Sequence, residues 1–216
     1  MRIPSHPCAM LALAVALLLT SLRAEARDDP GPVNGTFPPC VRVVGTNGGQ
    51  ASQQFGEFEV VWLDLANNPI PGALIRVDFS AIPELHIAAD QPDPEAIVDC
   101  AGKGVSKLTD ANGRAVFCIV GASTGAGSGV TLLNGCKIFA NGRLCASPTA
   151  SAFDLDGSNG LGAGDLAVFL SDFSTGQNLG RSDYDCSGYL GAADLSIWLI
   201  AFASGTQTVS AAPTCP

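Results

Sequence analysis

The sequence predicts a mainly β protein, a sandwich of about seven strands, followed by a small α-helical region. Between residues 40 and 150, apolar or alternating runs of four to eight residues are separated by Gly, Pro, Asn and Asp, which is typical of short strands joined by turns. After residue 150, one pattern of a loop and a helix occurs twice. The 216 residues are enough for one or two domains with hydrophobic cores.

Residues 1–26 have the pattern of a secretory signal peptide. Arg2 and His6 precede an apolar run of 14 residues, and Ala24, Glu25 and Ala26 form a small-x-small cleavage site. The apolar run is too short to span a bilayer as a helix. We therefore expect a secreted, extracellular protein, with or without attachment to a cell surface, whose mature chain has no membrane span.

The mature chain is strongly acidic. From residue 27 onward it contains nine basic and nineteen acidic residues, a net charge of −10. Such a chain is not expected to bind nucleic acid or anionic membranes through non-specific electrostatic attraction. Its negative charge instead favours the binding of divalent cations.

Seven cysteines remain after the signal peptide, and in an exported protein they are expected to form disulfides. None has the C-x-x-C spacing of a zinc site, and the odd number leaves at least one unpaired or bonded to another molecule. The seven are Cys40, Cys100, Cys118, Cys136, Cys145, Cys186 and Cys215.

The region before residue 150 begins with a Pro-rich, extended lead-in at residues 27–39. The dipeptides Asn112-Gly113 and Asn141-Gly142 predict hairpins with type I′ turns. The expected strands lie within residues 40–44, 55–65, 73–79, 104–109, 114–120, 129–133 and 136–140.

Aromatic residues at Phe58, Trp62 and Phe79 in this region are open to two interpretations. They could line a carbohydrate-binding platform, but aromatics at alternating strand positions more often belong to the core, and we expect the core. His86, the one histidine of the mature chain, is expected in a surface loop.

No catalytic motif is present in the sequence. It contains no nucleophile elbow, metalloprotease helix or phosphate loop, and the spacing of its glutamates indicates no carboxylate pair for glycoside hydrolysis. We therefore expect a protein that is not an enzyme. The glutamates considered are Glu57, Glu59, Glu84 and Glu95.

Two segments of the β region carry a family resemblance. The chain reads DLANNPIPGALIRVDFS at residues 64–80 and TDANGRAVF at residues 109–117. Together they resemble the bacterial immunoglobulin-like domains of invasin-type surface proteins. The resemblance implies an Ig-like sandwich over residues 40–150 that acts as a spacer, display or adhesion module, with no catalytic residues.

The C-terminal region contains an internal duplication. Residues 154–176 and 183–205 align at a constant offset of 29 residues, with eleven of the 23 positions identical. Numbered from its first aspartate, each loop has side-chain oxygens at positions 1, 3, 5 and 12, an available carbonyl at position 7 and leucine at position 8. This is the ligand spacing of an EF-hand calcium loop, so we expect two Ca²⁺ ions. The predicted ligands are Asp154, Asp156, Ser158, the carbonyl of Gly160 and Asp165 in the first loop, and Asp183, Asp185, Ser187, the carbonyl of Tyr189 and Asp194 in the second.

Each loop is followed by an amphipathic helix pattern that ends near Gly176 or Gly205. We expect the two helices to pack antiparallel through their apolar stripes. Cys186, at position 4 of the second loop, should point away from the metal, and a disulfide to Cys215 would close the tail over the helices. The stripes are Leu166, Phe169, Leu170 and Phe173, and Leu195, Trp198, Leu199 and Phe202.

The duplicated unit has aspartate at position 12, a turn residue at position 6 (Asn159 or Gly188) and no helix pattern before either loop, since ASPTASAF and QNLGRS are coil-like. Over residues 151–216 it resembles the dockerin module of bacterial cellulosomal and related secreted proteins. The resemblance implies calcium-dependent folding and docking to a cohesin-like protein or surface scaffold. The family's partner contacts at positions 10 and 11 correspond to Ala163, Gly164, Ala192 and Ala193.

Two alternatives to docking stay open. Calcium could only stabilise a structural or adhesive surface protein that has no cohesin partner. The chain could also be an accessory protein in the secreted degradation of polysaccharides.

Overall fold

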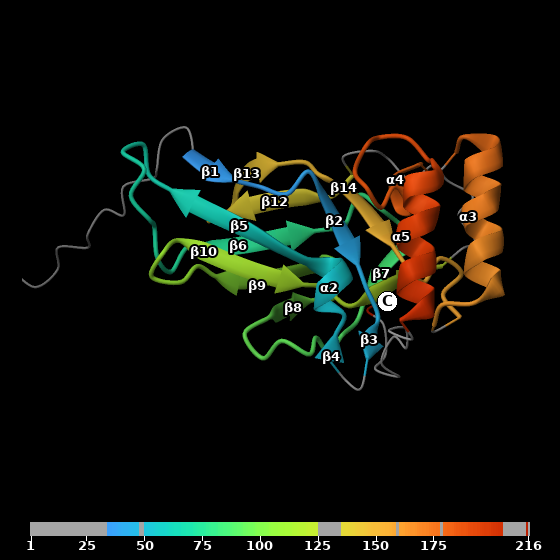
Figure 1. Ribbon diagram of the computed structural model, residues 1–216. Helices are drawn as coiled ribbons and strands as arrows, with labels where there is room; N and C mark the ends of the chain where they lie inside the picture. The colour runs from blue at the N-terminus through green and yellow to red at the C-terminus, as the bar shows by residue number, and fades with distance from the viewer. Residues whose placement is uncertain are drawn as a thin grey trace, which may run out of the picture. The chain divides into compact units, whose positions relative to one another are not determined.

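Two antiparallel β-sheets contribute to the largest buried core (Figure 1). The computed structural model describes residues 34–47, 50–124, 135–158, 160–177, 179–204 and 215. All of them belong to one compact unit, Pro32–Pro216. The predicted signal peptide at residues 1–26 lies outside the described residues.

The first sheet has three strands in the order β1-β5-β10, and the second has five in the order β13-β12-β6-β9-β8. The strands of the first sheet are β1 (Asn34–Thr36), β5 (Glu57–Leu63) and β10 (Arg114–Cys118). Those of the second are β6 (Leu74–Asp78), β8 (Ile97–Asp99), β9 (Gly104–Leu108), β12 (Lys137–Ala140) and β13 (Arg143–Ala146).

Alternate residues of the strands face a shared core, because successive side chains of a strand point to opposite faces. Trp62 and Phe117 from the first sheet belong to the same buried cluster as Ile75 and Ile138 from the second. Phe79 is also fully buried, and Phe58 stacks on Phe117 with ring centroids 5.3 Å apart. The expectation of core positions is therefore confirmed for Trp62 and Phe79, whereas Phe58 is only partly buried and packs against the core.

Shorter strands and one short helix complete the β region. Among them, β2 and β14 pair in parallel at the junction between the sheets and the helices (Figure 1). The elements are β2 (Cys40–Val43) with β14 (Thr149–Ala152), β7 (Leu85–Ile87) with β11 (Gly121–Ser123), β3 (Thr46–Asn47) with β4 (Gln50–Ala51), and α2 (Gln53–Gly56).

The prediction of a mainly β chain is confirmed, and six of the seven expected segments contain a strand. The seventh, residues 129–133, lies outside the described residues. Strand β1 falls within the segment predicted as a lead-in. Strand β14 occupies part of the segment predicted as coil, because its four residues are small and include no bulky apolar side chain that would indicate a strand.

The loop predicted around His86 is instead strand β7. The ring is partly buried, and its Nδ1 lies 3.1 Å from the carbonyl oxygen of Cys215, to which it donates a hydrogen bond. The backbone N–H of Cys215 in turn donates to the carbonyl of Ile87. Strand β7 therefore holds Cys215, which is far away in the sequence.

One of the two predicted hairpins is correct. Asn141 and Gly142 have φ values of 48° and 82° and join β12 to β13. The turn at Gly113 is not a hairpin, because it joins β9 of one sheet to β10 of the other. The Asp110 carboxylate shapes this turn by accepting hydrogen bonds from the backbone N–H groups of Asn112 and Arg114.

The disulfides join distant parts of the chain. Cys40 is bonded to Cys186 and Cys100 to Cys215, with Cα–Cα distances of 5.6 and 4.8 Å. The expected bond between Cys186 and Cys215 is therefore wrong. Within the described ranges, the free cysteines are Cys118, Cys136 and Cys145. The first bond ties a predicted calcium loop to a β-strand.

The C-terminal helices are α3 (Ala163–Thr175), α4 (Leu179–Ser182) and α5 (Ala192–Ala203). Helix α4 occupies part of a segment predicted as coil. No helix of the described residues is long and apolar enough to cross a membrane.

An aromatic cluster attaches this helical region to the β region. Phe153, Phe169, Tyr184 and Trp198 are buried together with Phe55 of α2. The Tyr184 hydroxyl donates to the carbonyl of Ala152 at 2.8 Å, and Trp198 Nε1 donates to the carbonyl of Phe153 at 3.3 Å. The helical region therefore shares a core with the β region.

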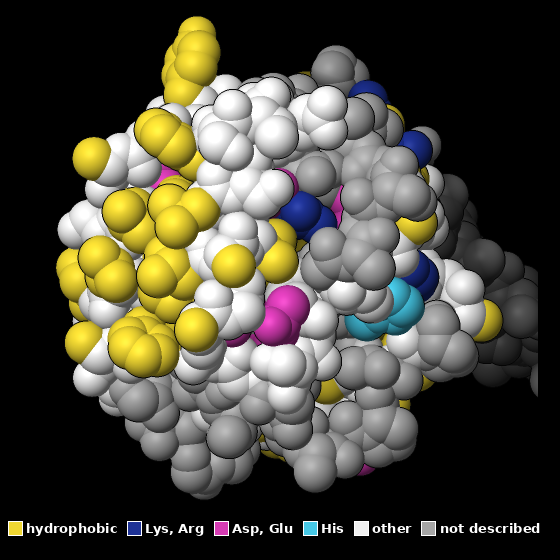
Figure 2. Space-filling view, turned by 90° about the vertical axis from the view of Figure 1, so that its right-hand side faces the viewer, with side chains coloured by type: hydrophobic (Ala, Val, Ile, Leu, Met, Phe, Trp, Pro, Cys, Tyr) yellow, Lys and Arg dark blue, Asp and Glu magenta, His cyan; other side chains and the backbone are white. Residues whose placement is uncertain are grey.

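The predicted helix stripes are only half buried. Phe169 and Trp198 are buried, and Leu166 and Leu195 pack partly against the aromatic cluster. The other four stripe residues are 45–54% exposed, so the expectation that the helices bury both stripes against each other is wrong. These four are Leu170, Phe173, Leu199 and Phe202. Figure 2 shows hydrophobic side chains gathered on this side of the molecule.

A buried ion pair joins α3 to α4. Arg181 donates to both carboxylate oxygens of Asp172 at 2.8 and 2.7 Å, and the Ser182 hydroxyl donates to the same carboxylate. The two charged side chains are 5% and 2% exposed. Asp172 is the one aspartate after residue 150 that is not a predicted metal ligand, so its role is structural.

We predict that Asp172→Ala lowers the free energy of unfolding by about 3–5 kcal/mol, because it leaves Arg181 buried without its counter-charge. Urea denaturation of the full chain would measure this loss. The matched control is Asp172→Leu combined with Arg181→Met, which removes both charges and should cost clearly less. A single substitution with no effect on stability would contradict the assigned role of the pair.

Candidate metal centres

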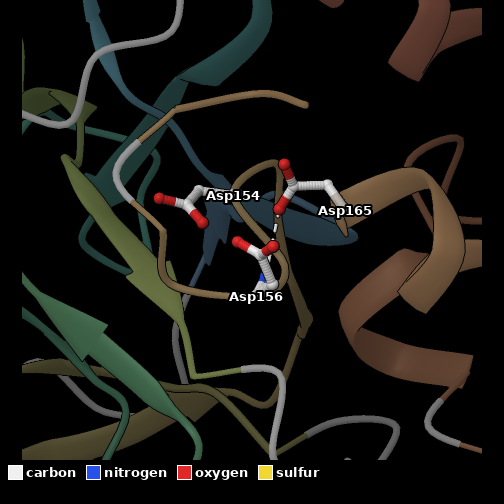
Figure 3. A group of neighbouring side chains, drawn as sticks. All are labelled: Asp154, Asp156 and Asp165. Carbon is white, nitrogen blue, oxygen red and sulfur yellow. Dashed lines mark hydrogen bonds between the residues drawn. The ribbon is translucent and has the colours of Figure 1, made fainter. Parts of the chain in front are cut away.

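The structure brings together two groups of three aspartates, one in each duplicated loop. Asp154, Asp156 and Asp165 form the first triad, and Figure 3 shows their carboxylates converging from the loop and from the start of α3. The second triad is Asp183, Asp185 and Asp194. In each triad, one carboxylate oxygen from every residue lies within 4.8 Å of the others. Each group could therefore hold a metal ion.

The closing aspartate links each loop to its helix. Asp165 is the third residue of α3, and its Oδ1 accepts hydrogen bonds from the backbone N–H groups of Leu155 at 2.6 Å and Asp156 at 3.0 Å. Its Oδ2 accepts from the N–H of Gly162 at 2.7 Å. A negative charge at this place is also favoured by the helix dipole.

The second loop repeats this arrangement residue by residue. Asp194 Oδ1 accepts from Tyr184 N–H at 2.8 Å and Asp185 N–H at 3.0 Å, and its Oδ2 accepts from Gly191 N–H at 2.8 Å. The duplication seen in the sequence is therefore also a duplication of hydrogen-bond geometry.

The first aspartate of each loop is the point around which the loop turns. Asp154 accepts hydrogen bonds from the N–H groups of Gly157 and Gly160 at 2.8 and 3.2 Å. Asp183 accepts from Ser187 and Gly188 at 3.1 and 2.9 Å. Both aspartates are almost completely buried, so each carboxylate is fixed before any ion binds.

The other predicted ligands lie in the same loops but outside the triads. The N–H groups of Ser158 and Ser187 donate to Asp156 and Asp185, respectively. The Ser187 hydroxyl donates to the carbonyl of Tyr189 at 3.1 Å, so the predicted ligands at positions 5 and 7 are neighbours. Tyr189 is 76% exposed, and the group predicted as a ligand is its backbone carbonyl.

Positive φ occurs at three positions of the loops, and at position 7 Gly160 has a φ of 152°. Gly188 at position 6 has a φ of 79°, as the predicted turn requires, and Asn159 at the equivalent position lies outside the described residues. Position 4 is also left-handed, with φ of 71° at Gly157 and 65° at Cys186. No sequence pattern predicted this for Cys186, since non-glycine residues rarely adopt this conformation.

Glycine at position 11 of the first loop has a steric reason. A β-carbon at Gly164 would overlap the carboxylate of Asp156. The second loop has Ala193 at this position, so the two sites differ in the space around the second carboxylate.

The electrostatics of the sites favour a cation. Burial raises the pKa of Asp165 and of Asp183, whereas a hydrogen bond from the Ser187 side chain lowers the pKa of Asp185. Three converging carboxylates give each triad a formal charge of −3 when ionised. A donor set made of oxygen atoms, without histidine or cysteine, fits a hard divalent cation.

Sequence reasoning missed one charged neighbour of the second site. Arg42 of β2 donates a hydrogen bond from Nε to the carbonyl oxygen of Tyr184 at 2.6 Å. Arg42 is 142 residues away in the sequence, so no local pattern could have identified it.

A cavity of about 460 Å³ lies on the β region, away from the triads, and is lined in part by Lys107 and Cys118. The Lys107 ammonium donates to Asp93 at 2.7 Å and to the carbonyl of Val116 at 2.8 Å. Burial raises the pKa of the Cys118 thiol to about 12, so it is protonated at neutral pH. Neither group is an activated nucleophile.

No protein-family model matches this chain, and the searches of curated proteins and of solved structures found no match either.

Proposed function

We propose that the chain is a secreted, non-catalytic protein in which a dockerin-like module binds two Ca²⁺ ions and docks an Ig-like sandwich to a cohesin-like protein or surface scaffold. The observation that carries the calcium assignment is the pair of matching aspartate triads at the ligand spacing of an EF-hand loop. The two sheets that share one core support the Ig-like assignment. The two disulfides support an oxidising, extracellular environment.

Calcium would act on the fold by removing repulsion. Without a cation, three carboxylates within 4.8 Å of one another oppose loop closure. Calcium offsets this repulsion and fixes Asp165 and Asp194 at the starts of α3 and α5. Short helices need such support, because they are unstable in isolation.

The exposed faces of α3 and α5 support the docking role. Leu170 and Phe173 on α3, and Leu199 and Phe202 on α5, are each about half exposed. The acidic residues of both helices, Asp165, Asp172 and Asp194, are buried, so the exposed faces carry no charge. An uncharged apolar surface of this kind is typical of an interaction site. The small residues at positions 10 and 11 of both loops are also exposed.

A second candidate function is favoured by the contacts between the two regions. The aromatic cluster and the Cys40–Cys186 disulfide join the calcium loops to the β region within one compact unit. Calcium could then serve only to rigidify a structural or adhesive protein. A role as an accessory protein in polysaccharide degradation receives less support, since Trp62 and Phe79 are buried and cannot form a sugar platform.

The predicted ligands should differ in how much they contribute to calcium affinity. Asp165→Ala and Asp194→Ala should each weaken calcium binding at their own loop by about a hundredfold or more, because each removes a charged ligand and the hydrogen bonds that close the loop. Ser158→Ala and Ser187→Ala remove a neutral ligand that water can replace and should cost about tenfold or less. Calorimetric titration of the four full-length variants measures this. Serine variants as damaging as the aspartate variants would contradict the assignment.

The second prediction concerns docking. The full chain, immobilised in calcium, should capture an extracellular protein of the producing cell that chelator releases. Leu170→Ser combined with Leu199→Ser should bind calcium normally but lose capture, because both residues lie on the exposed helix faces. If the wild-type chain binds two calcium ions and captures nothing, the purely structural role of calcium replaces docking.

A further inference from the structure

Strand β2 holds the second calcium loop at two points. Cys40 and Arg42 are two residues apart in β2 and so project from the same face of the strand. Cys40 is bonded to Cys186 at position 4 of the loop. Arg42 donates from Nε to the carbonyl of Tyr184 at position 2, and from Nη1 to the carbonyl of Phe55 at 3.4 Å. The guanidinium is therefore fixed between α2 and the loop.

The position of Arg42 places a positive charge beside the second triad. All three of its carboxylates, Asp183, Asp185 and Asp194, act on the guanidinium: burial lowers the pKa of Arg42, and these three aspartates oppose that shift. Arginine remains charged under any ordinary condition. A cation of the β region is therefore held against the backbone of the second loop, at the residue between Asp183 and Asp185.

We propose that Arg42 is a built-in counter-ion of the second loop, which stabilises the ion-free loop and weakens its calcium binding. This inference rests on the proposed calcium function.

The charges at the second loop decide whether Arg42 strengthens or weakens calcium binding. Without calcium, the guanidinium is attracted to a triad of formal charge −3. With calcium bound, the same site has a formal charge of −1, so the attraction falls to about a third. A group that stabilises the ion-free state more than the bound state lowers affinity for the ion, by linkage. At the effective dielectric of a partly buried site, removing this one charge should raise affinity by about tenfold.

The consequence is a loop whose fold depends only partly on calcium. The disulfide at position 4 and the hydrogen bond at position 2 keep the second loop against β2, and the guanidinium reduces the repulsion among its carboxylates. The β region thus lowers the calcium affinity of the second loop of the dockerin-like module.

The test is a calcium titration of the full chain followed by NMR, in which the backbone amides of Gly157 and Gly188 report the two loops separately. Arg42→Gln removes the charge and keeps an N–H donor, and it should tighten binding at the second loop by about tenfold. Arg42→Lys keeps the charge and should bind calcium as the wild type does. Neither variant should change the first loop by more than about twofold.

The salt dependence of calcium binding distinguishes an effect of the Arg42 charge from an effect of the position of its side chain. The difference between wild type and Arg42→Gln should shrink in high salt, because a charge effect is screened and a positional one is not. Unchanged or weaker binding in Arg42→Gln, with calcium still bound at both loops, overturns this inference alone. If the wild-type chain binds calcium at neither loop, the proposed function fails and this inference fails with it.

A measurement on the wild-type chain covers the case in which a variant does not fold. The Arg42 Nε–H resonance should shift as the second loop fills with calcium, because the guanidinium lies in the field of that site. A resonance that stays constant while the Gly188 amide titrates would overturn the proposal.

Discussion

The carboxylates of Asp165 and Asp194 join three features of the C-terminal region. Each accepts two hydrogen bonds from the start of its loop and one from the residue before its helix. The same group closes the loop, lies in the first turn of the helix and provides the third carboxylate of the triad. The placement of Phe169 and Trp198 in the aromatic cluster, four residues after each carboxylate, depends on this closure. The exposed faces of α3 and α5 depend on it as well.

The second constraint is the attachment of these loops to the β region. Tyr184 lies between Asp183 and Asp185 of the second triad. Its side chain is fully buried against Phe153, and its hydroxyl donates a hydrogen bond to the carbonyl of Ala152. The disulfide at Cys186 and the hydrogen bond from Arg42 act on the same loop. Changes in the β region should therefore reach the second aspartate triad through a few contacts.

The sequence predicted those parts of the structure that depend on neighbouring residues. The six aspartates predicted as ligands form two triads, because each triad lies within 12 residues and the loop geometry is local. The strands with clear polar alternation, such as β5 and β10, were predicted for the same reason. Contacts between distant residues were not predictable: the Cys40–Cys186 pairing and the position of Arg42 each span more than 140 residues. Strand β14 was missed because its residues are small and include no bulky apolar side chain.

The most direct test of the account is the calcium stoichiometry of the full chain, combined with its effect on thermal unfolding. Titration calorimetry should find two bound Ca²⁺ ions per chain, and calcium should raise the melting temperature relative to chelator. Magnesium at the same concentration should give a smaller rise, because Mg²⁺ demands near-ideal octahedral geometry and gives up its water ligands reluctantly. Absence of calcium binding, or a melting temperature that does not respond to chelator, would contradict the assignment of the two triads as calcium sites.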